Sequence, residues 1–176
     1  MLDRLTKAGD SCCMLAVFYP RVDLLFRPNI ELVGVLRRFV SSFFHGILTE
    51  DDVVSRLALA THELLENAVK YTSDGGTSLS ISVDDERVLS IRVENRASPD
   101  DIARLSRAVE AMNASGDAFA HYQELMRRAA RQPLGSGLGL ARIGAESEMT
   151  MSVAVRGDRV LVVGGTRLGL PTRVDA

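Results

Sequence analysis

Three polar side chains in one predicted helix have the types and spacing for phosphate chemistry. Glu63, Asn67 and Lys70 stand at positions i, i+4 and i+7 of the run 61–72. At about 100° per residue, they fall within roughly 60° of arc on the helix. Asn offers a hard oxygen to Mg²⁺, Lys binds phosphate, and Glu can accept a proton from an attacking group. The pattern therefore fits a site for a metal-bound phosphate chain, although a solvated helix face would also carry polar residues.

A glycine-rich segment favours the first of these interpretations. Gly135, Gly137 and Gly139 alternate with Ser136 and Leu138 ahead of an amphipathic stretch. Backbone N–H groups in such a loop and at a helix start attract anions, and glycine lets a phosphate approach closely. The segment is neither the Rossmann fingerprint nor the P-loop, because no Gly-Lys-Ser/Thr follows.

The two motifs, in this order, resemble the GHKL superfamily of gyrase, Hsp90, histidine kinases and MutL. The residues Glu63 to Thr72 resemble its N box, and Gly135 to Leu140 resemble its G2 box in the spelling of histidine kinases. The resemblance implies an ATP-binding α/β sandwich, the Bergerat fold, with ATP and Mg²⁺ as cofactors.

The same resemblance implies a role for each matching residue. Asn67 would be the Mg²⁺ ligand, Glu63 the catalytic general base, and Lys70 a residue that approaches the phosphates. The end of the lid over ATP would be formed by the glycine-rich residues Gly135, Gly137, Leu138 and Gly139.

One family motif is altered in this chain. The G1 box of the family is Asp-x-Gly-x-Gly after a strand, and its Asp binds the adenine amino group. Here the strand of residues 88–93 runs into Glu94 and Asn95, and both glycines are absent. Glu94 or Asn95 could take the adenine contact, since an Asn side chain both donates and accepts. A turn role for Asn95 fits the sequence equally well.

Composition narrows the classes of function. The 176 residues carry a net charge of −2, which argues against a generic nucleic-acid binder. No apolar run reaches the roughly 18 to 20 residues of a membrane span. Adjacent Cys12 and Cys13 have no metal-ligand partners nearby and suit a reducing compartment, so we expect a cytoplasmic protein.

The segments before the polar helix predict one strand region and one helix. Residues 15–19 and 22–26 are short apolar runs typical of an edge strand or hairpin. Asn29 is the expected N-cap of a helix to about Phe44, which Gly46 would end. Thr49 and the acidic residues after it would cap the polar helix.

The rest of the chain alternates strands and helices. Residues 79–83 and 89–93 have apolar residues at every second position and predict a hairpin. Ser98 and Pro99 begin a helical region that would form most of the lid, at about 97–134, and residues 151–163 predict a final hairpin. We therefore expect an α+β fold over a single domain, 1–176. It would be a two-layer α/β sandwich whose mixed, mostly antiparallel sheet has helices on one face.

The element order resembles that of stand-alone anti-sigma serine kinases. This implies an ATP- and Mg-dependent kinase that phosphorylates Ser or Thr of a STAS-domain antagonist in a partner-switching pathway. The alternative is a catalytically silent module that sequesters a sigma factor or antagonist. A homodimer is the default expectation. The role of Glu66 stays open, and His62 lacks the neighbours of a phosphoacceptor histidine.

Overall fold

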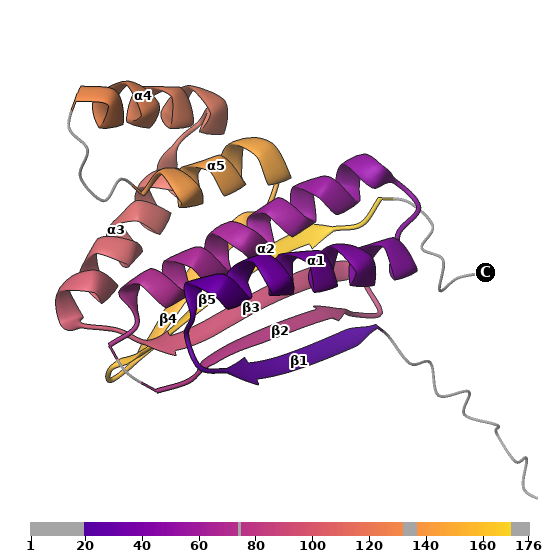
Figure 1. Cartoon of the computed structure of the whole chain (residues 1–176). Helices are drawn as coiled ribbons and strands as arrows, with labels where there is room; N and C mark the ends of the chain where they lie inside the picture. Colours follow the sequence, from indigo (N-terminus) through magenta and orange to yellow (C-terminus); the bar gives the residue numbers. More distant parts are fainter. Residues whose placement is uncertain (1–19, 74, 132–136, 170–176) are drawn as a thin grey trace, which may run out of the picture.

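One face of a five-stranded antiparallel sheet is covered by helices (Figure 1). This computed structural model describes residues 20–73, 75–131 and 137–169. The strand order is β1-β2-β3-β5-β4, and each neighbouring pair is antiparallel. The expected two-layer α/β sandwich is confirmed, and in the described part of the chain its sheet is wholly antiparallel rather than mixed.

Alternating side chains explain the sheet. The strands are β1 (Arg21–Phe26), β2 (Thr77–Val83), β3 (Val88–Arg96), β4 (Thr150–Arg156) and β5 (Arg159–Arg167). Every second residue of β2 is buried, and the same holds from Leu89 to Asn95 in β3. Because successive side chains of a strand point to opposite faces, one face packs on helices while Ser, Arg and Glu occupy the other.

Five helices follow from capping and from apolar residues at helical spacing. They are α1 (Ile30–Ile47), α2 (Asp51–Tyr71), α3 (Pro99–Ala114), α4 (Ala118–Arg131) and α5 (Leu138–Ser147). Asn29 caps α1, its side chain accepting a hydrogen bond of 2.8 Å from the N–H of Glu31. Ser98 caps α3 in the same way, through the N–H of Asp101.

Two expected helix boundaries are wrong. Gly46 does not end α1, which continues to Ile47 and is closed by the N–H of Leu48 bonding to the carbonyl of Phe44. Thr49 does not cap α2: the N-cap is Glu50, without a side-chain capping bond. Asp51 and Asp52 in the first turn still favour the positive end of the helix dipole.

The core lies between the sheet and α1, α2 and α5. Leu57 and Leu65 of α2 pack there with Phe44 of α1, and Ile81 and Ile91 supply the sheet side. The helices α3 and α4 occupy the chain between β3 and α5, where the lid is expected; residues 132–134 of that range lie outside the described part. Figure 1 shows α4 stacked on α5, away from the sheet, and none of its side chains is buried.

None of the helices in the described part of the chain combines the length and the apolarity that crossing a membrane requires.

Candidate functional site

A pocket of about 200 Å³ opens between the helical layer and the sheet, next to the polar face of α2. Its walls are mostly apolar, with a small number of polar groups, the usual composition of a small-molecule site. The lining residues are Leu64, Asn67, Ala68, Tyr71, Val93, Asn95, Ala97, Asp101, Arg104, Leu105, Ala108, Gly137, Leu140, Val160 and Val162. Residues from α2, β3, α3, α5 and β5 thus converge on one cavity.

The two candidates for the adenine contact lie on opposite faces of β3. Asn95 is 5% exposed and lines the pocket, beside Val160 of the neighbouring strand. Glu94 belongs to the other face, where its carboxylate accepts a hydrogen bond of 2.7 Å from Arg159. Asn95 is therefore a strand residue rather than a turn residue, and Glu94 is outside the pocket.

A single hydrogen bond orients the Asn95 amide. Its Nδ2 donates to the carbonyl of Arg96 at 3.0 Å. Within the described residues this is the side chain's one hydrogen bond, so its Oδ1 remains available as an acceptor. A group that donates a hydrogen bond is the natural complement at this end of the pocket.

The N-box-like helix and the glycine-rich segment meet directly. A Cβ atom added at Gly139 of α5 would lie 2.5 Å from Oε2 of Glu63 and 3.5 Å from Nδ2 of Asn67. Only glycine permits this approach, because such a short distance to Oε2 would force the carboxylate to move. Gly137, which lines the pocket, precedes α5 with a φ of 57°, in the left-handed region.

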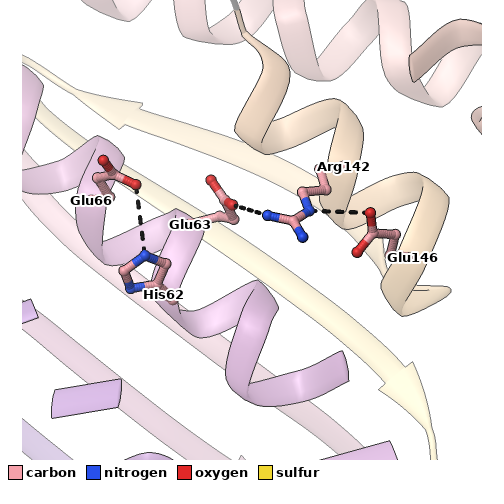
Figure 2. A network of polar contacts seen from close by, with 5 residues as sticks. All are labelled: His62, Glu63, Glu66, Arg142 and Glu146. Atoms are coloured by element: carbon pink, nitrogen blue, oxygen red, sulfur yellow. Dashed lines mark hydrogen bonds and ion pairs between the residues drawn. The ribbon is translucent and has the colours of Figure 1, made fainter. Parts of the chain in front are cut away.

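Glu63 is held by an arginine that the sequence motifs did not single out. Figure 2 shows the guanidinium of Arg142 between the carboxylates of Glu63 and Glu146. Its Nη1 lies 3.3 Å from Oε1 of Glu63, and its Nε lies 3.1 Å from Oε1 of Glu146. The hydrogen bond to Glu146 is the main reason that the pKa of Arg142 is raised; burial opposes it, and the charges of Glu146 and Glu63 add to it.

Lys70 and Leu138 stand outside the pocket lining. The Lys70 side chain is exposed, with its Nζ 5.2 Å from the centre of the Tyr71 ring. Arg104 of α3 approaches the same ring, with its Cζ at 5.6 Å, and pairs with Asp101 at 2.8 Å. Two cations therefore lie close to one pocket-lining aromatic ring. Gly135 lies outside the described residues.

Glu66 faces away from the Glu63 carboxylate. Its Oε2 lies 3.8 Å from Nε2 of His62, one turn back along α2. The two acidic side chains of the motif point to different sides of the helix (Figure 2). Glu66 is therefore not part of the group formed by Glu63, Asn67 and Gly139.

The side chains of the site could hold Mg²⁺ only if phosphate oxygens supplied part of its ligands. No cluster of three or more His, Cys, Asp or Glu side chains exists among the residues that the structure describes. Mg²⁺ commonly keeps several waters and takes one or two protein ligands together with phosphate oxygens. The carboxamide oxygen of Asn67 is suited to that role.

Tyr71, Asp101 and Arg104 line the pocket although sequence reasoning missed them. Tyr71 follows Lys70 in the N-box-like run, and its distance of four residues from Asn67 places it on the same side of α2. Asp101 and Arg104 carried no comparable signal, because their position depends on how α3 returns over the sheet.

Comparison with known proteins identifies a similar fold. No protein-family model matches the chain. No curated protein matches it either. Among solved structures, a chain from the crystal structure of the SiaB–SiaC complex from Pseudomonas aeruginosa is similar, with a TM-score of 0.57 and 17% sequence identity. The match covers 81% of this chain and 88% of that chain. At this identity the likeness supports the fold, a two-layer α/β sandwich.

Proposed function

We propose that the protein binds Mg·ATP in the pocket between Asn67 and Asn95 and transfers the γ-phosphoryl group to a Ser or Thr of a partner protein. The observation that supports this most is the contact between α2 and α5. It brings Glu63, Asn67 and Gly139 together beside a pocket with the buried acceptor Asn95 at its sheet side. The resemblance to the GHKL superfamily supplies the reaction.

Each residue has a defined role in the proposed reaction. The partner's hydroxyl oxygen attacks the γ-phosphorus, the bond to the β–γ bridging oxygen breaks, ADP leaves, and the hydroxyl proton passes to Glu63. Asn67 would hold Mg²⁺, which neutralises charge on the phosphates. Asn95 would accept a hydrogen bond from the adenine amino group, and Lys70, with the backbone around Gly137 and Gly139, would meet the phosphates.

The partner class rests on two likenesses. The resemblance to anti-sigma serine kinases implies a STAS-domain antagonist, a sigma factor, or both. The solved structure of similar fold comes from a complex of two proteins. We therefore propose a regulatory kinase of a partner-switching pathway.

Calorimetric titration with ATP tests the nucleotide site. We expect saturable binding whose affinity falls at least about tenfold without Mg²⁺ or in Asn67→Ala. Either change removes the interaction between Asn67 and the Mg²⁺ that the phosphates hold. Glu63→Gln keeps the side-chain size, so it should bind Mg·ATP as the wild type does but transfer no phosphate. Unchanged transfer by Glu63→Gln would remove Glu63 from the mechanism.

A silent binding module is the second candidate. The ion pair between Glu63 and Arg142, together with the absent G1 glycines, is the observation that favours it. Absence of binding at millimolar ATP would give this candidate the lead, and the domain would then sequester a sigma factor or antagonist without chemistry.

A further inference from the structure

Arg142 is shared between two carboxylates of different exposure. The side chain of Glu63 is 14% exposed, whereas those of Arg142 and Glu146 are 40% and 38% exposed. Within the described part of the chain, Arg142 is the one ion-pair partner of Glu63. The more deeply buried acid thus depends on this guanidinium for its counter-charge (Figure 2).

The pairing opposes the step that Glu63 would perform. A carboxylate that takes up a proton loses the charge that attracts the guanidinium, so proton transfer to Glu63 must break the ion pair. One of its oxygens faces Arg142, and the other lies against Gly139. In this arrangement one carboxylate oxygen of Glu63 is engaged by Arg142 instead of facing an attacking group.

Glu146 gives Arg142 an alternative partner. It lies one helical turn further along α5, and its carboxylate already accepts a hydrogen bond from Nε of Arg142. A guanidinium has five N–H donors and pairs well with one carboxylate through two of them. Arg142 can therefore move wholly onto Glu146 without losing its counter-charge, and a half-exposed pair tolerates that movement.

We propose that Arg142 is a positioning residue that latches Glu63. Paired with Glu63, it keeps the carboxylate in place and inactive; paired with Glu146 alone, it releases the carboxylate to accept a proton. The inference rests on the proposed function of Glu63. The latch ties α5, which follows the lid, to the N-box-like helix, so a movement of α5 reaches the proton acceptor directly.

Arg56 provides a matched control. Like Arg142, it bridges two carboxylates, Asp52 on α2 and Glu148 after α5, both at 3.3 Å. It joins the same two parts of the fold but contacts no residue of the proposed site. A purely structural role for a guanidinium between α2 and α5 would therefore give Arg56 and Arg142 the same behaviour.

Basal hydrolysis of Mg·ATP by the full chain measures the latch with water as acceptor. Arg142→Gln should raise the rate of hydrolysis about fivefold. This factor corresponds to removing the free energy of one partly exposed ion pair from the activation barrier. Glu146→Gln should lower the rate, because Arg142 then has only Glu63. Arg142→Lys should fall between the wild type and Arg142→Gln, and Arg56→Gln should match the wild type. Thermal melting shows whether each variant is folded.

Opposite effects of Arg142→Gln and Glu146→Gln support the latch, because damage to structure would lower both rates. Reduced hydrolysis in both variants, or an equal rise in Arg56→Gln, overturns it. The Arg142 Nη signals in ¹⁵N NMR, without nucleotide, should shift in Glu63→Gln, because Nη1 is the atom that faces Glu63; unchanged Nη signals overturn the latch alone. Bound Mg·ATP with no hydrolysis by the wild type or by Arg142→Gln overturns the latch, whereas no binding of Mg·ATP overturns the proposed function and the latch with it.

Discussion

Two adjacent residues, Glu94 and Asn95, show how position within a strand decides a chemical role. Their side chains leave β3 in opposite directions, so one forms a surface ion pair with Arg159 while the other is 5% exposed in the pocket. The Asn95 amide is fixed by its bond to the carbonyl of Arg96, which leaves Oδ1 as the acceptor. This acceptor complements the amino group of adenine and not the oxo group of guanine.

We expect the wild type to bind Mg·ATP at least about tenfold more tightly than Mg·GTP. Adenine would donate a hydrogen bond to Oδ1 of Asn95, whereas the oxo group of guanine would leave this acceptor unpaired. Asn95→Leu keeps the side-chain size, removes the acceptor and should abolish this preference. Calorimetry with both nucleotides provides the measurement. Glu94→Gln is the control and should bind both as the wild type does; a preference that survives in Asn95→Leu would remove Asn95 from base recognition.

Some positions in the site could be predicted from the sequence, and others could not. Leu89, Ile91 and Val93 are buried at alternate positions, so the period of the strand already predicts that Asn95, and not Glu94, faces the helices. The pairing of Glu63 with Arg142 joins residues 79 apart in the chain. No local pattern predicts such a contact, because it depends on how α5 packs against α2.

At the scale of elements, α5 packs on α2 with Gly139 directly against the Glu63 carboxylate. A methyl group there would stand 2.5 Å from Oε2 of Glu63, which lies at the free end of a flexible side chain. The carboxylate can move aside at little cost in stability, but it then leaves its contact with Arg142. This contact therefore constrains function more than folding.

Gly139→Ala should change the free energy of unfolding by no more than about 1 kcal/mol, because alanine favours the helix and offsets the contact. It should reduce Mg·ATP turnover at least about tenfold, since displacement of a catalytic group is costly. Denaturant unfolding and steady-state hydrolysis measure the two effects. Gly46→Ala in α1 is the matched control, because its Cβ would meet nothing within 4 Å; equal loss of turnover in both variants would contradict the account.

Two of the three expected helix starts are confirmed, whereas α2 begins after Glu50 rather than at Thr49. Asn29 and Ser98 cap α1 and α3 as expected, because each side chain bonds to a backbone N–H two or three residues later. Gly46 was expected to end α1, but it lies inside the helix. The residues next to it in the sequence do not show this. Packing of Phe44 and Ile47 in the core carries the helix past the glycine.

At the scale of the whole molecule, helices cover one face of the sheet and leave an apolar row on the outside of α1. Leu32, Val35 and Phe39 are 36%, 49% and 44% exposed and share one side of that helix. Among the described residues, β1 is an edge strand of the sheet and pairs with β2 alone. Homodimerisation, the default expectation from the sequence, would cover such a surface.

We expect light scattering to give twice the monomer mass for the wild type, and the monomer mass for Phe39→Glu, because a buried charge opposes association. Phe119→Glu on α4 introduces the same charge at an exposed apolar position, 57% exposed, and should remain dimeric. A monomeric wild type, or dissociation of both variants alike, would contradict a dimer through α1.

The fold as a whole was predictable because independent signals agreed. Alternation in β2 and β3, caps at Asn29 and Ser98, and the order of strands and helices all indicated one helical layer on one sheet. Pairing direction was less certain, since alternation alone does not distinguish an antiparallel sheet from a mixed one. The placement of α4 on α5 had no signal beyond its amphipathic pattern.

The contact between Glu63, Gly139 and Arg142 also has a consequence for how the sequence can change over generations. Under the proposed mechanism, a chain that no longer transfers phosphate loses the reason to keep a small residue at position 139 and a cation at position 142. Replacements at positions 63, 139 and 142 should therefore occur together in related sequences. Asn95 lines the pocket, away from this contact, and should vary independently of these three positions.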